Sequence, residues 1–95
     1  MNWIDLLTNT LRDTKQLKEK YSGSYMLQSA IDQIEYLIDL ESGKSTDASK
    51  LQTINIGLIA VRAVEDMDMD VADKLHAVAA EVRKMVAANA NEPIP

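Results

Sequence analysis

The sequence predicts an all-α fold, a compact antiparallel bundle of about four helices in which the third helix is the most buried. Apolar residues recur at three- and four-residue intervals in three separate stretches, which is typical of helices that bury one face. The chain holds only 3 Gly and 2 Pro, so few residues are suited to the turns of a β-protein. With no Phe and one Trp, the core has to be built mainly from aliphatic side chains.

The first helix is expected over residues 3 to 21. Its apolar stripe consists of Trp3, Ile4, Leu7, Leu11 and Leu17. In the run that follows, Gly23 can adopt a left-handed C-cap conformation and Ser24 can cap the next helix. Because so short a turn usually joins antiparallel neighbours, the first two helices should pack side by side.

The second helix is expected over residues 25 to 40. Its apolar residues form one continuous stripe, namely Leu27, Ala30, Ile31, Ile34, Leu37 and Ile38. Asp32, Glu35 and Asp39 lie on the opposite side, and residues 32 to 41 contain no basic residue. Like charges at these spacings destabilise an isolated helix. We interpret this acidic stripe either as a solvated face or as a ridge that meets a cationic partner.

The third helix is predicted over residues 51 to 64, LQTINIGLIAVRAV, as one buried element. A lone strand there would leave its backbone groups unpaired, because the sequence offers no second strand. Gly57 indicates close approach by another helix backbone or by a partner. Among the polar residues of this helix, either Asn55 or Arg62 is a candidate to face a cleft. The linker before this helix holds four residues of the type that cap helices: Ser45, Thr46, Asp47 and Ser49.

The fourth helix is expected over residues 71 to 88, after an acidic loop at 65 to 70 from which Asp68 or Asp70 can cap it. Its stripe is Val71, Leu75, Val78, Val82 and Met85 or Val86. Residues 1–88 are therefore predicted as a single helical domain, and residues 89–95 as a frayed tail.

The composition excludes several classes of protein. The chain has a net charge of −5, is 46% hydrophobic and contains no Cys, so disulfides and thiolate metal sites are excluded. No stretch approaches the roughly 20 apolar residues of a membrane span, and Asp5 interrupts any signal-like run, which predicts a cytoplasmic protein. The acidic surface disfavours binding to nucleic acid or anionic membranes and favours a basic protein partner.

The sequence favours neither a metal site nor catalysis. The spacing Asp66-x-Asp68-x-Asp70 begins like a calcium loop, but Val71 and Ala77 occupy the positions that require Gly and Glu. His76, the only histidine, is predicted to be solvated on the polar side of the fourth helix, beside Asp73. We expect no cleft of several hundred cubic ångström in so small a bundle, and no cofactor.

Two blocks of the chain resemble a known family. The first joins Tyr21-x-Gly23-x-Tyr25 to LQSAIDQIEYL at residues 27 to 37, with Ser29, Ala30, Gln33, Ile34 and Tyr36 at matching positions. The second is INIGLIAVRAVED at residues 54 to 66, which carries Gly57, Ile59, Ala60, Val61 and Arg62. Together they resemble the small helical immunity proteins of bacterial type VI secretion, the antitoxins of an NAD(P)⁺-hydrolysing effector. The likeness runs from about Tyr21 to the middle of the fourth helix, and the first helix matches poorly.

The resemblance implies a non-enzymatic protein that binds a secreted toxin's catalytic domain and blocks its substrate site. The toxin it implies is an NAD(P)⁺ glycohydrolase with an ADP-ribosyltransferase-like fold. The candidate toxin-binding residues are Tyr25, Asp32, Glu35, Tyr36 and Asp39 on the second helix, with Glu65, Asp66, Asp68 and Asp70 in the acidic loop. Two alternatives stay open. One is immunity to a different nucleotide-consuming toxin, such as a nucleotide pyrophosphokinase. The other is a helical scaffold or dimerisation module that associates with its own copy.

Overall fold

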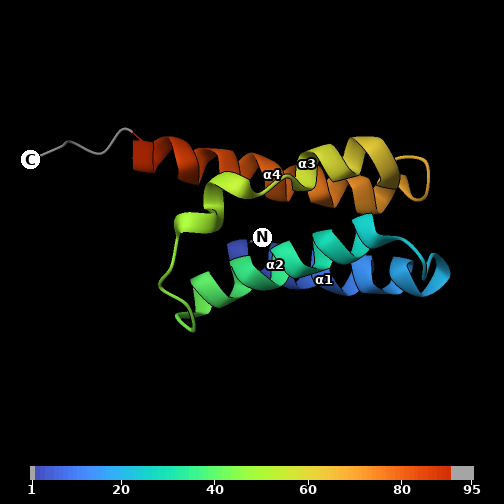
Figure 1. Cartoon of the computed structure of the whole chain (residues 1–95), viewed down its shortest axis with the longest axis horizontal. Coiled ribbons are helices and arrows are strands. Elements are labelled where there is room, and N and C mark those ends of the chain that lie inside the picture. Colours follow the sequence, from blue (N-terminus) through green and yellow to red (C-terminus); the bar gives the residue numbers. More distant parts are fainter. Residues whose placement is uncertain (1, 91–95) are drawn as a thin grey trace, which may run out of the picture.

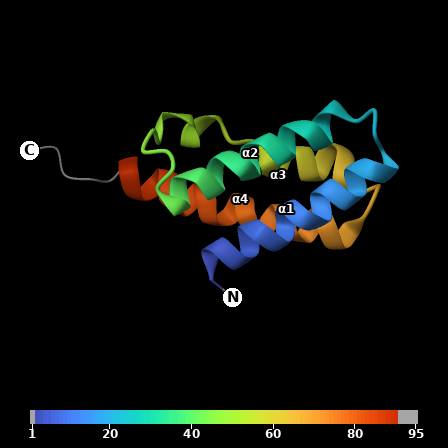
Figure 2. The ribbon, with the colours of Figure 1, turned by 90° about the horizontal axis from the view of Figure 1, so that it is seen from below.

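The computed structural model describes residues 2–90, which fold into two layers of helices (Figure 1). One layer contains α1 (Trp3–Lys20) and α2 (Tyr25–Ser42), and the other contains α3 (Ile56–Ile59) and α4 (Met69–Ala90). Successive helices run in opposite directions, and a view turned by 90° shows α4 passing behind the pair α1 and α2 (Figure 2). The predicted all-α antiparallel bundle is therefore confirmed.

The core lies between the layers and is built from the predicted stripes of α2 and α4. Leu27, Ile34, Leu75 and Val78 are all fully buried. In α1, however, the buried face includes Thr10 and Thr14, which the apolar pattern did not mark. Their hydroxyls donate to the backbone carbonyls of Leu6 and Thr10, at 2.6 and 2.7 Å. This bond within the helix satisfies the hydroxyl, so each threonine packs like a small aliphatic residue.

The turn between α1 and α2 is closed by backbone and side-chain hydrogen bonds. Ser24 caps α2 as predicted, since its Oγ accepts from the Leu27 backbone N–H at 3.2 Å. The prediction of a left-handed Gly23 is wrong. The Ser24 N–H donates to the Tyr21 carbonyl at 3.0 Å, and this tight turn needs no positive φ. Among the described residues the one left-handed glycine is Gly43, with φ 84°, at the C-terminus of α2.

The segment 51–64 is not one continuous helix, which corrects the prediction. A short 3₁₀ helix, η1 (Ser49–Thr53), precedes α3, and α3 continues as a wider π turn, η2 (Ala60–Val64). Between η1 and α3 the chain is extended at Ile54. The Gln33 side chain on α2 stabilises this break: its Oε1 accepts from the Asn55 backbone N–H at 2.9 Å, and its Nε2 donates to Asn55 Oδ1 at 2.7 Å. This side chain thus replaces the backbone partner that a continuous helix would supply.

Burial within the same segment is divided between two faces. The side facing the core is buried as expected, at Leu51, Ile56, Ile59, Ala60 and Val64. By contrast, Leu58 is 48% exposed and Val61 is 56% exposed. No side chain of the preceding linker caps η1, whose N-cap is Ala48, although Asp47 Oδ1 accepts from the Ser49 N–H at 3.0 Å.

At the other end of the second layer, Asp68 caps α4 as predicted, because its Oδ1 accepts from the Val71 N–H at 3.2 Å. The helix extends to Ala90, two residues beyond the predicted end. The rest of the predicted tail, residues 91–95, lies outside the described residues.

The ion pair of Asp13 on α1 with Lys74 on α4 joins the two layers and predicts a dependence of stability on pH. The hydrogen bond from Lys74, aided by Arg12, holds the pKa of Asp13 below its ordinary value despite partial burial. A carboxyl whose pKa is lowered by folding stabilises the fold above its unfolded pKa of about 4, and this contribution is lost as the pH falls below that value.

We therefore expect Lys74→Met to reduce stability at neutral pH and to weaken the loss of stability that wild type shows below about pH 4. Urea unfolding of both proteins from neutral to acidic pH measures this. Lys84→Met is the matched control, since Lys84 pairs with Glu81 on the same helix and its side chain is 74% exposed. Parallel pH profiles for wild type and Lys74→Met would contradict the expectation.

Candidate functional site

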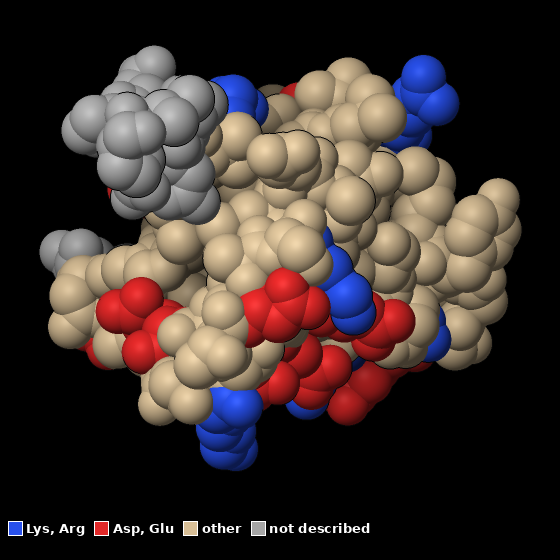
Figure 3. Space-filling model, turned by 60° about the vertical axis from the view of Figure 1, so that its left-hand side comes forward, with Lys and Arg blue, Asp and Glu red and all other residues tan. Residues whose placement is uncertain are grey.

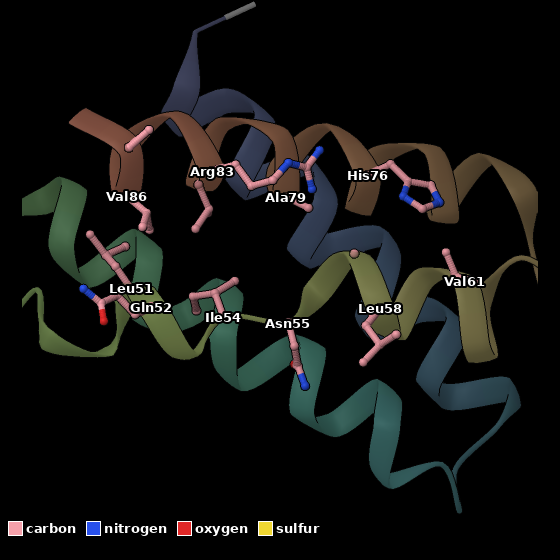
Figure 4. A pocket seen from close by; sticks show the side chains of 13 residues that line it. Leu51, Gln52, Ile54, Asn55, Leu58, Val61, His76, Ala79, Arg83 and Val86 are labelled. Carbon is pink, nitrogen blue, oxygen red and sulfur yellow. The ribbon is translucent and has the colours of Figure 1, made fainter. Parts of the chain in front are cut away.

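A groove lies between the segment η1–α3 and helix α4 (Figure 4). Its volume is about 930 Å³, so the expectation that this bundle has no cleft of several hundred cubic ångström is wrong. Gly57 and Ala79 form the floor of the groove, and an added Cβ at Gly57 would lie 3.2 Å from Ala79 Cβ. The larger side chains on either side of this contact line the groove: Leu51, Ile54, Leu58 and Val61 on one wall, and His76, Val82, Arg83 and Val86 on the other.

Most of the groove wall is apolar. Leu58 and Val61 lie three residues apart and therefore share one face of α3 and η2, where both are about half exposed. Asn55 precedes them on the same face, at the break beside Ile54. Asn55 thus lines a cleft as expected, whereas Arg62 is exposed and is not among the residues that line the groove. Exposed large aliphatic residues that gather in a groove are typical of a binding surface.

Arg83 and His76 bring polar chemistry to this groove from α4. Figure 4 shows the Arg83 side chain extending along α4 above Ala79, on the side toward His76. An added Cβ at Gly57 would lie 3.9 Å from Arg83 Nη1, so the guanidinium lies over the groove floor. Among the described residues, Arg83 has no hydrogen-bond or ion-pair partner.

His76 has a different environment from the one predicted. Its Nε2 lies 2.8 Å from Glu65 Oε2, so it pairs with a carboxylate at the end of η2 and not with Asp73 on its own helix. Both side chains are about one-third exposed. The pair joins η2 to α4 at one end of the groove, because the loop at 65–68 folds the chain back on itself.

A smaller hollow of about 200 Å³ adjoins the groove on the α2 side. It is lined by Ser29, Asp32, Gln33, Tyr36, Lys50, Thr53 and Ile54. Ile54 also lines the groove, and Gln33 is bonded to Asn55, so the two depressions share a wall. The Tyr36 hydroxyl donates to the Asp47 carbonyl at 2.7 Å, and burial raises the pKa of this phenol. Lys50 Nζ lies 6.0 Å from the centre of the same ring.

The predicted acidic stripe of α2 is exposed only in part and has partners. Asp32 is exposed and accepts from Gln28 Nε2 at 2.9 Å, while Glu35 lies 3.7 Å from Lys15 on α1. The stripe therefore does have a nearby cation, contrary to the expectation from local sequence. Asp39 is half-buried, and Tyr25 at the start of α2 is 83% exposed.

The acidic loop does not join that stripe. Asp68 and Asp70 line a separate hollow with Lys20 and Lys74, beside α1. Glu65 is paired with His76, and Asp66 is exposed. The nine candidate residues are thus spread over several surfaces. Asp32 and Tyr36 adjoin the groove through the smaller hollow, and Glu65 contacts His76 at one end of the groove.

Charge is also unevenly distributed. On the face shown in Figure 3, Asp and Glu side chains gather in the lower half, where Figure 1 places the layer of α1 and α2. The upper half of that face is mostly uncharged. On this face the acidic side chains therefore lie apart from a largely uncharged region above them.

Sequence reasoning missed Leu58, Val61 and Arg83 as site residues. A signal for the first two was present: on a helical wheel they lie opposite Ile56, Ile59 and Ala60, which marks an apolar stripe facing away from the core. Arg83 has no such signal, because an arginine on the polar side of an amphipathic helix is ordinary.

Neither a metal site nor a membrane span is found in the part of the chain that the structure describes. Within residues 2–90, no three side chains of His, Cys, Asp or Glu gather as a metal site would require. None of the helices over these residues is both long and apolar enough to cross a bilayer.

The comparison with protein families decides the identity. A family model described as Tsi6 matches residues 2–84. The chain belongs to the Tsi6 family. Tsi6 is a family of type VI secretion immunity proteins, and an immunity protein binds a cognate toxin protein. Membership of this family suggests a non-catalytic role for the chain. The prediction that the chain belongs to a family of type VI secretion immunity proteins is confirmed.

The Tsi6 match also extends the resemblance to the N-terminus. It includes all of α1, which seemed a poor match from the sequence, and it covers the groove residues as far as Arg83. Searches of curated proteins and of solved structures gave no match.

Proposed function

We propose that this Tsi6-family chain is an immunity protein that binds the catalytic domain of a cognate secreted toxin and occludes its active site. The observation that carries the proposal is the family match over residues 2–84. The toxin we propose is an NAD(P)⁺ glycohydrolase with an ADP-ribosyltransferase-like fold, on the strength of the two resembling blocks at residues 21–37 and 54–66. Since NAD(P)⁺ is consumed inside the cell, the place of action is the cytoplasm.

The electrostatics of the molecule support this role. An enzyme that binds a phosphorylated dinucleotide needs a positively charged cleft, and the net charge of −5 and the acidic side chains that gather on the face shown in Figure 3 are complementary to one. Asp32 and Glu35 are exposed on α2, and Asp32 lines the hollow that adjoins the groove. Long-range attraction of this kind mainly increases the association rate.

Co-expression tests the proposal directly. Production of the toxin encoded beside this chain should arrest growth and deplete NAD(P)⁺, and co-production of the chain should restore both. The purified chain should also form a complex with the toxin's catalytic domain and inhibit it. Loss of a different nucleotide, with rescue by the chain, would keep the immunity role and replace the proposed substrate. Absence of any complex would overturn the immunity role itself.

A second candidate, self-association, is favoured by one observation. Within the described part of the chain, four large apolar residues are exposed: Tyr25, Leu58, Val61 and Met69. A dimerisation module would show a molecular mass that rises with concentration in the absence of toxin. An immunity protein that acts as a monomer would keep the mass of one chain until the toxin is added. Light scattering of the chain alone separates the two candidates.

Charge reversal identifies the acidic surface that the toxin meets. We expect the triple change Asp32→Lys, Glu35→Lys and Asp39→Lys to reduce the association rate about tenfold at low salt, with little change in dissociation. Stopped-flow measurements at several salt concentrations give both rates. The same change in net charge at Asp66, Asp70 and Asp73 tests the acidic loop and the start of α4, where two of the other candidate residues lie. Equal effects of the two triple variants would remove α2 from the interface.

A further inference from the structure

We propose that the groove between α3 and α4 is the anchor of the toxin interface, and that it receives an apolar toxin side chain with a carboxylate next to it. The inference rests on the proposed function and adds the site and the chemistry of the contact. It differs from the role of the α2 carboxylates, which attract the toxin but are too well hydrated to hold it tightly.

The apolar half of the proposed occupant follows from the groove wall. Leu58 and Val61 are about half exposed in the unbound chain, and each would lose its remaining contact with water against an apolar side chain. Val82, at 4% exposed, and Ala79, at 7% exposed, form the opposite side on α4. Binding energy in protein interfaces is concentrated in such desolvated pockets.

The acidic half follows from Arg83. Its guanidinium lies over the floor of the groove and has no partner among the described residues. At the other end, His76 Nε2 already has a partner, because it lies 2.8 Å from Glu65 Oε2. An occupant that fills the groove would remove water from Arg83, and this burial is unfavourable unless the occupant supplies an anion. A carboxylate is the group that matches a guanidinium with two parallel hydrogen bonds.

The same charge argues against a second copy of the chain as the occupant. In a twofold-symmetric dimer this groove would face itself, and its lining contains no Asp or Glu that could pair with Arg83 of the other copy. Each partner would also carry the net charge of −5. A basic toxin that presents one carboxylate beside an apolar side chain satisfies both the local and the overall charge.

Single substitutions test the anchor, with the catalytic domain of the toxin encoded beside this chain as the probe. Leu58→Asp places a carboxylate in a groove whose lining has none, where it would repel the carboxylate of the toxin, and Arg83→Glu replaces the cation by an anion. Each should increase the dissociation rate about tenfold or more, with a smaller effect on association. Arg62→Glu is the matched control, because it changes the net charge equally at an exposed residue that does not line the groove. It should leave dissociation within about threefold of wild type.

The outcomes separate this inference from the proposed function. Failure of the wild-type chain to bind the toxin domain would overturn the proposed function. If wild type binds, and Leu58→Asp and Arg83→Glu dissociate as slowly as wild type, the groove is not the anchor while the immunity role stands. Equal acceleration by Arg62→Glu would reduce the Arg83 effect to net charge, and a dimer of the chain alone that Leu58→Asp abolishes would assign the groove to a second copy. Unchanged thermal unfolding of each variant shows that its fold is intact.

Discussion

Leu75→Ala is expected to lower the free energy of unfolding by about 2–5 kcal/mol. Leu75 is fully buried in α4, between the two layers, and a shortened side chain there leaves a cavity that the rigid helices cannot fill completely. In a domain of this size the change corresponds to a fall in melting temperature of roughly 4–8 °C per kcal/mol. Urea and thermal unfolding measure both quantities.

Leu58→Ala is the matched control for this substitution, since it removes the same atoms from a residue that is 48% exposed. Its effect should be about 1 kcal/mol or less, because part of the side chain is already in water and no closed cavity forms. Similar losses at the two positions would show that the burial described for α4 is incorrect. The same Leu58 variant weakens toxin binding if the groove is the anchor.

Gly57→Val is expected to cost about 1–3 kcal/mol. Its Cβ would lie 3.2 Å from Ala79 Cβ, which is closer than side chains usually pack, so α3 and α4 would have to separate. Valine also fills part of the groove that Gly57 and Ala79 line, and we therefore expect weaker toxin binding from the same variant. Chemical unfolding and toxin dissociation, measured together, test both effects.

Two further variants show whether this cost is steric. Ala79→Gly in the Gly57→Val background removes the methyl group that the new Cβ meets, and should restore part of the lost stability. Gly23→Val is the control, because a Cβ at Gly23 meets nothing within 4 Å and its φ is not positive. A loss at Gly23 as large as that at Gly57 would argue against close helix packing as the cause.

The helices that pack on one face were predictable from sequence, and the segment that packs on several was not. In α2, apolar residues at regular spacing meet one surface, so periodicity alone identified Leu27, Ile34 and Leu37. The burial of Thr10 and Thr14 was not predicted, because their hydroxyls form hydrogen bonds within the helix and a hydrophobicity pattern does not contain this information. The break in the helix at Asn55 depends on a hydrogen bond to Gln33, 22 residues earlier, so the local helix propensity does not predict it.

The features of the candidate functional site likewise fall into those that the sequence predicts and those that it does not. The family and the acidic character were evident in the sequence, because motifs and charge are properties of residue order. The groove was not, since it arises where a broken segment meets α4 and combines residues as distant as Leu51 and Arg83. The pairing of His76 with Glu65, 11 residues away, likewise needs the turn that brings η2 against α4.

The two hydrogen bonds between Gln33 and Asn55 also affect how the surface meets a partner. They fasten the groove wall to α2 from the opposite layer, so the irregular stretch around Ile54 is already held before any toxin arrives. Association then orders few additional torsions, and less of the contact energy is lost to conformational entropy. A preorganised surface of this kind suits an inhibitor that must engage its target at first encounter, without a slow adjustment of shape.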